Sequence, residues 1–348
     1  MLLVTNTIPT KLDFSRLLLL RQSLGVFGNS MSNWKTNLIR AYRFCMTPYR
    51  QFRWFNMARK ARVPAIVLFY HRVADDHPND WSMSCKEFKQ QIDWMQDNFD
   101  IVSLEEAQHR IMSSGNDRPT LSITFDDGYA ENCEFALPLL IERRIPATYF
   151  VTTDHTFNQK PFPHDVELGC PLPANTIESL LAIDRAGIEI GAHTRNHADL
   201  GSITDERVLV DEVIAATIEL EAVLQRKIRY FAFPYGQVAN LNDKVFGMLR
   251  ETGLLGVCSA YGGWNEVGDD PFHIQRLHGD PNFERMKNWL TYDPRIQRVQ
   301  RYVPSGEAFD KELLQETVRA AKERVKQSPV TLPCSVELPV LQTPNATQ

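Results

Sequence analysis

Two short groups of polar residues carry the chemistry that this sequence suggests. Asp126 and Asp127 stand side by side between an apolar run and Gly128, and His193 and His197 stand four residues apart further along the chain. One carboxylate and two imidazoles are enough to bind a divalent metal ion such as zinc. The second carboxylate would then be free to act as a base on water beside the metal. The combination suggests a metal-dependent hydrolase.

Each group also has an ordinary structural explanation. Asp-Asp-Gly is common in turns, because these residues tolerate turn backbone geometry. A pair of histidines at i and i+4 shares one face of a helical turn, and one solvated and one core imidazole would give the same spacing. The two groups support each other if both follow strands of one sheet.

Apolar runs alternate with helix-like segments from Pro64 onward. Strands are predicted at 65–70, 121–125, 147–151, 188–191, 230–233, 255–259 and 274–277, and helices at 86–99, 129–144 (with a kink at Pro138), 204–224, 245–251 and 312–326. This alternation predicts an α/β fold, a parallel sheet covered by helices, either open or closed into a barrel. Both polar groups then follow strand ends, where such folds carry their active sites.

The composition changes sharply over residues 31–62. Eight Lys or Arg residues and seven aromatic residues occur there without one acidic residue. A basic, aromatic, partly helical segment is typical of contact with an anionic membrane surface. The alternative is that the aromatic residues pack on the main domain. Pro48, which interrupts the helical period, favours this alternative.

The overall composition excludes other classes of protein. A formal net charge of −5 gives no case for nucleic-acid binding. No segment reaches the ~18–20 apolar residues of a membrane-spanning helix, and the run 17–20 is too short for the core of a signal peptide. The six cysteines are scattered, which favours reduced thiols. We therefore expect a cytoplasmic protein that could also bind peripherally at the membrane through residues 31–62.

Several motifs, in order, resemble those of the polysaccharide deacetylase family, the carbohydrate esterases of family 4 with a NodB homology domain. Residues 124–129 resemble its T-F-D-D-G-Y signature, residues 193–197 fit H-[ST]-x-x-H, and residues 233–236 fit the P-Y-G part of a third motif. The resemblance runs from Tyr70 to the region of Arg276. It implies a distorted (β/α) barrel of about seven strands that removes N-acetyl groups from amino sugars of a polysaccharide or a lipid-linked glycan.

The resemblance also implies a domain layout and a metal site. Residues 1–62 would be an N-terminal extension, 63–300 the catalytic domain, and 301–348 a C-terminal helix with a disordered tail. The metal ligands would be Asp127, His193 and His197, and the metal would be zinc, with cobalt or nickel as alternatives. Asp126 would be the general base, and Thr194 would help to hold the loop that carries the histidines.

Substrate contacts follow from the third motif and from a late strand. The backbone N–H of Tyr235, next to Gly236, would face the carbonyl oxygen of an N-acetylated glycan. Many members have an arginine two residues before the proline of this motif, where this chain has Ala232. Arg276 resembles an arginine of a subgroup and could supply that charge to the base. The alternative is an ordinary surface or salt-bridged arginine.

The proton donor is the weakest part of the resemblance. The family's L-x-L-x-H motif is matched poorly by residues 274–278, so His278 is the candidate general acid, and return of the proton by Asp126 is the alternative. Other functions remain open: hydrolysis of another small amide, such as an N-formyl sugar, or carbohydrate binding with reduced or lost turnover. His71 could line the site, and Trp81 and Trp264 could stack on a sugar or pack in the core.

Overall fold

The computed structural model describes residues 33–112, 115–293, 296 and 299–327. Contacts within the chain divide it into Met1–Cys45 and Met46–Gln348, and the boundary falls inside helix α2 (Asn33–Arg59). The fold below is that of the second unit. The tail predicted to be disordered lies outside the described residues, and the domain boundaries at 62 and 300 stay predictions.

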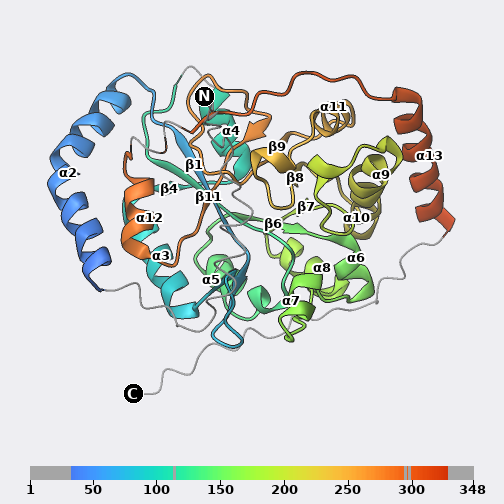
Figure 1. Ribbon diagram of the computed structural model, residues 1–348, viewed down its shortest axis with the longest axis horizontal. Helices are drawn as coiled ribbons and strands as arrows, with labels where there is room; N and C mark the ends of the chain where they lie inside the picture. The colour runs from blue at the N-terminus through green and yellow to red at the C-terminus, as the bar shows by residue number, and fades with distance from the viewer. Residues whose placement is uncertain (1–32, 113–114, 294–295, 297–298, 328–348) are drawn as a thin grey trace, which may run out of the picture. The chain divides into compact units, whose positions relative to one another are not determined.

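A parallel sheet lies at the centre of the second unit (Figure 1). Within the described residues it has nine strands, ordered β10-β9-β8-β7-β6-β5-β1-β11, with β4 also paired to β5. The strands are β1 (Ala65–Tyr70), β4 (Asp100–Ile101), β5 (Thr120–Phe125), β6 (Ala147–Val151), β7 (Glu189–Ala192), β8 (Tyr230–Ala232), β9 (Gly256–Cys258), β10 (His273–Ile274) and β11 (Leu277–His278). A separate pair is formed by β2 (Arg72–Val73) and β3 (Ser82–Met83). β1, β5 and β6 are buried along their whole length, as expected for strands covered on both faces.

One short segment brings the two ends of the strand order together. β10 pairs with β9 at one end, whereas β11, which starts three residues after β10 ends, pairs with β1 at the other end. Asn265 bridges the gap: its amide donates to the carbonyls of Ala65 (3.2 Å) and Gln275 (2.9 Å), and its Oδ1 accepts the Gln275 N–H (2.8 Å). The predicted strand 274–277 is therefore broken, because its two parts pair with different neighbours. The expectation of a distorted α/β barrel is confirmed.

Helices surround the sheet (Figure 1). They are α3 (Cys85–Asn98), α4 (Leu104–Met112), α5 (Ala136–Glu142), α6 (Thr153–Asn158), α7 (Pro163–Glu167), α8 (Ile177–Arg185), α9 (Glu206–Val210), α10 (Ala216–Leu224), α11 (Asp243–Glu251), α12 (Phe283–Leu290) and α13 (Lys311–Gln327), with short turns η1 (Ala130–Cys133), η2 (Leu200–Ser202) and η4 (Val238–Asn240) and a π-helical turn η3 (Asp211–Ala215). Helix α3 begins with a capping box, in which Ser84 and Glu87 satisfy each other's backbone N–H groups, and it buries Phe88, Ile92 and Met95 in the core.

Three predicted helices differ in detail. The segment 129–144 is two elements, η1 and α5, and Pro138 lies in the first turn of α5, where proline is tolerated and causes no kink. The segment 204–224 contains the π-helical turn η3 between α9 and α10. Helix α2 continues through Pro48, so the predicted interruption there is wrong.

No helix among the described residues has the length and apolar character needed to cross a bilayer.

Replacing Asn265 by alanine tests the closure of the barrel. The change leaves the backbone N–H and carbonyl of Gln275 buried without these partners, so we expect a loss of about 2–4 kcal/mol in the free energy of unfolding. The midpoint of thermal or urea unfolding measures this loss. Asn98→Ala, which removes an exposed amide bonded to the Trp94 carbonyl (2.7 Å), is the control and should cost under about 0.5 kcal/mol. Equal losses in the two variants would contradict the role given to Asn265.

Candidate active site

The polar residues singled out in the sequence all lie at or just after the carboxyl ends of strands. Because the strands are parallel, these ends meet at one edge of the sheet. The residues, each with the strand it ends or follows, are His71 (β1), Asp126 and Asp127 (β5), His193 and His197 (β7), Tyr235 and Gly236 (β8) and His278 (β11). The sheet thus places side chains from distant parts of the sequence at one edge.

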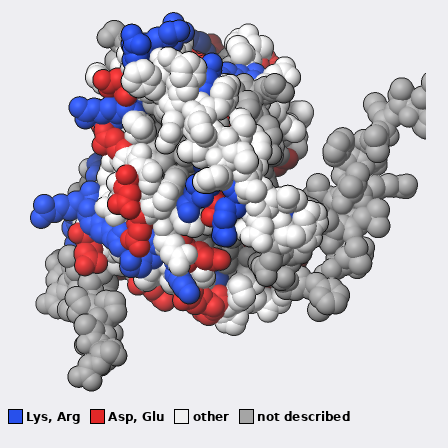
Figure 2. Space-filling model, turned by 90° about the vertical axis from the view of Figure 1, so that its left-hand side faces the viewer, with Lys and Arg blue, Asp and Glu red and all other residues white. Residues whose placement is uncertain are grey.

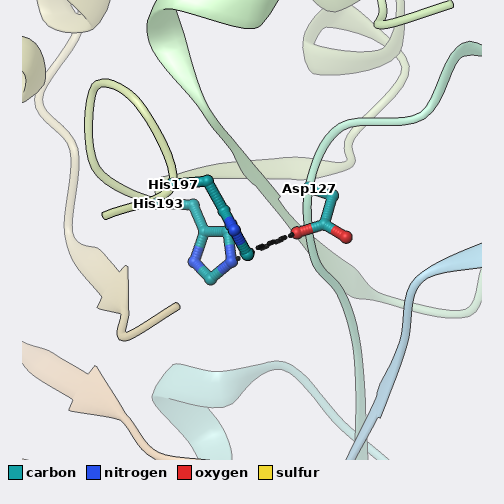
Figure 3. A group of neighbouring side chains, drawn as sticks. All are labelled: Asp127, His193 and His197. Atoms are coloured by element: carbon teal, nitrogen blue, oxygen red, sulfur yellow. Dashed lines mark ion pairs between the residues drawn. The ribbon is translucent and has the colours of Figure 1, made fainter. Parts of the chain in front are cut away.

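Asp127, His193 and His197 converge on one point (Figure 3). Oδ1 of Asp127 lies 3.4 Å from Nε2 of His193 and 3.2 Å from Nε2 of His197. One potential ligand atom from each residue lies within 4.8 Å of the others. Two imidazole nitrogens and a carboxylate oxygen are a ligand set typical of zinc and other first-row divalent ions.

The hydrogen bonds around this group fit a bound cation. Nδ1 of His193 lies 2.8 Å from the carbonyl of Ala232 and donates to it, so Nε2 is the nitrogen that faces Asp127. Within the described residues, Oδ1 of Asp127 is buried and accepts no hydrogen bond. Burial raises the pKa of Asp127, but His197 and His193 outweigh burial and hold the pKa well below its usual value, so the carboxylate is ionised. A buried carboxylate that faces two imidazole nitrogens is stabilised by positive charge at this point, which a bound cation would supply.

Strained backbone marks the same place. Asp127 (φ 72°), Thr194 (φ 64°), His197 (φ 58°) and Tyr235 (φ 59°) all have left-handed backbone, which non-glycine residues rarely adopt. Such conformations persist where surrounding contacts over-determine them, and they cluster at functional sites. At Asp127 the left-handed turn lets the two neighbouring carboxylates point in different directions.

The histidine-bearing loop is held by a residue that the sequence did not single out. The buried Glu212 of η3 accepts the backbone N–H groups of Arg195 (3.2 Å) and Asn196 (3.0 Å) and the Asn196 side-chain amide (2.6 Å). Thr194 adds the expected support, since its Oγ1 accepts the N–H of Ala198 (3.3 Å). The available signal for Glu212 was that it stands beside Asp211 within the otherwise mostly apolar run 208–218, but this pattern does not say which of the two carboxylates faces the loop.

Aromatic rings fix the orientation of His197. Phe162 meets it edge to face at 5.6 Å, and the ring of Tyr235 lies at 4.9 Å. Phe162 itself is fully buried and stacks on His155 at 4.0 Å. The imidazole therefore has little freedom to turn away from Asp127.

Asp126, next to Asp127 in the sequence, binds Arg276. The guanidinium donates from Nη1 to Oδ1 (2.6 Å) and from Nη2 to Oδ2 (2.8 Å), and its Nε donates to the carbonyl of Ser259 (3.0 Å). Burial raises the pKa of Asp126, but the charge of Arg276 outweighs burial and holds the pKa below its usual value. Arg276 is completely buried, so the alternative of a surface arginine is wrong.

Tyr235 and Gly236 form a tight turn beside His197. The Gly236 N–H donates to the Pro234 carbonyl (2.6 Å), and a Cβ on Gly236 would lie 2.7 Å from the Cβ of Ala260, so no larger residue fits. The Tyr235 N–H forms no hydrogen bond within the part of the chain that the structure describes. A backbone donor of this kind is suited to an oxyanion.

Two further imidazoles line the same edge. The rings of His278 and His71 are 5.9 Å apart, and the Nδ1 of His71 is buried without a partner. Burial, together with repulsion from His71, lowers the pKa of His278 to about 4, and burial also lowers the pKa of His71. Trp81 is half-exposed beside His71 (5.8 Å), whereas Trp264 is in the core and cannot stack on a ligand.

Comparison with known proteins finds similarity to polysaccharide deacetylases. A family model described as polysaccharide deacetylase matches residues 113–257. The candidate polysaccharide deacetylase YxkH of Bacillus subtilis (strain 168) is 25% identical over 214 residues, which cover 60% of this chain and 68% of YxkH. Over these residues the chain resembles the polysaccharide deacetylase family.

Solved structures share the fold of this chain. IcaB from Ammonifex degensii matches with a TM-score of 0.56 and 24% identity, covering 66% of this chain and 98% of IcaB. The Streptococcus pyogenes deacetylase PplD, solved in complex with acetate, matches with a TM-score of 0.56 and 21% identity over 67% of this chain and 99% of PplD. These similarities confirm the α/β architecture. The chemistry has to be argued from the residues of this chain.

Metal binding is the first test of the site. We expect wild-type protein to bind about one equivalent of Zn²⁺, and His193→Ala and Asp127→Asn to bind it at least about 100-fold more weakly, because each removes a ligand. Competition with a chromophoric chelator measures the affinities. His109→Gln, which changes an exposed histidine on α4, is the control and should bind as the wild type does. Equal affinity in wild type and His193→Ala would contradict the assignment.

Proposed function

We propose that this protein is a metal-dependent hydrolase that removes N-acetyl groups from amino sugars of a polysaccharide or lipid-linked glycan. The observation that carries the proposal is the division of labour between adjacent carboxylates. Asp127 faces two imidazoles, whereas Asp126 is bound by Arg276. This arrangement supports a metal site and a separate base side by side.

Asp127, His193 and His197 are the proposed metal ligands. A divalent ion held by them would act as a Lewis acid, which lowers the pKa of water and polarises a carbonyl oxygen. The identity of the ion is proposed as zinc, because two nitrogen ligands and one oxygen ligand with open positions suit it. The hydrogen bond from Nδ1 of His193 to Ala232 orients the ring so that Nε2 faces the site and would be the ligand atom.

Asp126 is the proposed general base. Arg276 keeps it ionised and fixes both of its oxygens, so it can accept a proton from water that attacks the amide carbon. The negative charge that develops on the carbonyl oxygen would be met by the Tyr235 N–H, in a turn that Gly236 makes possible. The exposed ring of Tyr235 and the half-exposed Trp81 offer apolar surface to a sugar.

The leaving amine needs a proton, and two donors are available. His278 lies at the correct edge, but its pKa of about 4 leaves the imidazole neutral at neutral pH. Asp126 holds the proton that it has just removed from water. We therefore favour return of that proton by Asp126, with His278 as donor only if a bound substrate raises its pKa.

Carbohydrate binding without turnover is the less favoured alternative. It was suggested by Ala232, which stands where many family members have the arginine that orients the base. Arg276 supplies a guanidinium to the same carboxylate from another strand, so this departure does not remove the charge. Hydrolysis of an N-formyl sugar would use the same residues. Assays with the two kinds of substrate distinguish this reaction from deacetylation.

Asp126→Asn tests the base. With zinc-loaded protein and N-acetylglucosamine oligomers, we expect acetate release to fall by about 10²–10⁴-fold while zinc stays bound, because the amide cannot accept the proton. A coupled acetate assay and metal content on the same sample measure both. Asp93→Asn, at a surface carboxylate paired with Lys89 and Arg143, should leave the rate unchanged. Formate release from an N-formyl sugar without acetate release from the oligomers would favour the alternative substrate, and no release of either would argue against the enzyme.

Arg276→Lys tests the orientation of the base. Lysine keeps the charge but cannot hold both carboxylate oxygens, so we expect kcat to fall about 10–100-fold with little change in KM. The control is Arg110→Lys, at the opposite end of β5, where the arginine bonds Glu106 and Thr120. Steady-state kinetics and the thermal midpoint separate lost orientation from lost stability. A change confined to KM, or to stability, would contradict the positioning role.

A further inference from the structure

Helix α2 is attached to the second unit by one face of its C-terminal half. Arg50, almost completely buried, donates from Nη1 to the carbonyls of Asn288 (3.1 Å) and Thr291 (2.7 Å) at the end of α12. The last carbonyls of a helix have no partners within it, so this arginine satisfies them and matches the negative end of the dipole. Four residues later, the ring of Trp54 packs on that of Trp264 (6.2 Å).

The opposite face of α2 carries exposed aromatic rings. Tyr49, Phe52 and Phe55 are 44%, 61% and 60% exposed, at the three-to-four-residue spacing of one helical face. The same helix also exposes Trp34 (59%) and Phe44 (81%). The expectation that these aromatic residues pack on the main domain holds for Trp54 and for Tyr49, whose ring lies 5.9 Å from that of Tyr292, and is wrong for Phe52 and Phe55. Because Arg50 and Trp54 hold one face of the helix against the domain, the rings on the opposite face remain exposed.

The charge of this region has one sign. Residues 33–62 contain no Asp or Glu, and the exposed cations include Lys35, Arg59, Lys60 and Arg62. Figure 2, which views the side of α2, shows a broad white area bordered by blue Lys and Arg groups, with red groups gathered towards the left and lower edges. The guanidinium of Arg59 lies over the ring of Phe55 (5.8 Å), so cation and aromatic ring stand together.

We propose that α2 is a peripheral membrane-binding helix that lies along the surface of an anionic bilayer. Phenylalanine and tryptophan rings enter the boundary between headgroups and acyl chains, and flanking Lys and Arg meet anionic lipid headgroups. The six Lys and Arg residues within its 27 residues exclude a spanning orientation. An aqueous protein partner would have to cover the rings and supply acidic groups along the whole helix, whereas an anionic bilayer offers both everywhere on its surface.

Membrane binding by α2 does not depend on the proposed reaction, because it would determine only the location of the protein. A two-dimensional surface concentrates the protein near any substrate that is itself at that surface. The anchoring contacts of Arg50 and Trp54 lie in the unit that carries the active site, so the helix and the site would be delivered together.

The test is co-sedimentation of the full chain with vesicles of phosphatidylcholine alone or with about 30% phosphatidylglycerol. We expect binding to the anionic vesicles that weakens with added salt, and little binding to neutral ones. Phe52→Ser with Phe55→Ser should lower the partition coefficient at least about tenfold, since both rings lose their burial in lipid. Arg59→Gln with Lys60→Gln should lower it about fivefold per cation.

Matched variants separate membrane contact from misfolding and from general stickiness. Met112→Ser with Val303→Ser removes two side chains of similar exposure (65% and 80%) elsewhere and should leave binding unchanged. Phe52→Trp with Phe55→Trp should retain it, and thermal midpoints should agree among all variants. Absence of binding by the wild type, or equal binding by the serine variant, would overturn the proposal. A dimer in light scattering that dissociates in the serine variant would also overturn it, by showing that a second copy covers the face.

Discussion

The buried pair of Asp126 and Arg276 is the interaction on which the site and the barrel both depend. A completely buried guanidinium is costly unless its charge and its donors are matched. Here Asp126 neutralises the charge, and Thr124 (3.1 Å) and the Ser259 carbonyl take the remaining bonds. These partners belong to β5 and to the end of β9, while Arg276 itself lies between β10 and β11. One side chain thus joins three parts of the sheet at its carboxyl edge.

The pair also explains why adjacent carboxylates do different work. Along a regular strand, neighbouring side chains point to opposite faces, and both carboxylates could not serve one edge. The left-handed backbone of Asp127 and the glycine that follows it turn the chain at the end of β5. Asp126 then binds Arg276, whereas Asp127 faces the two histidines. Without a cation on each side, two buried carboxylates in sequence would repel each other.

Much of this arrangement could be predicted from the sequence, because apolar runs and motif residues are local signals. The strands at 65–70, 121–125 and 147–151 lie within a residue of their predicted bounds, since continuous β-branched and aromatic runs are unambiguous. The break at Gln275 depends on which strands the two halves meet, and no local pattern encodes that. Glu212 and the π-helical turn around it could not be predicted either, because the groups that Glu212 binds lie in a loop 16 residues away. The exposed face of α2 could not be predicted, because aromatic composition alone does not say which face of a helix is covered.

The position of Arg276 has a further consequence. An arginine two residues before the Pro-Tyr-Gly turn would bind the base from β8, a regular strand in the middle of the sheet. In this chain the charge comes from the segment that closes the barrel, next to Gln275, whose backbone is held by Asn265. The orientation of the base therefore depends on barrel closure, and the polar contacts of Asn265 contribute to closure alongside the buried Ile274 and Leu277. A polar network of this kind is geometrically specific, since each donor fixes a direction as well as a distance. The same network that joins the ends of the sheet thereby sets the direction in which Asp126 can take a proton.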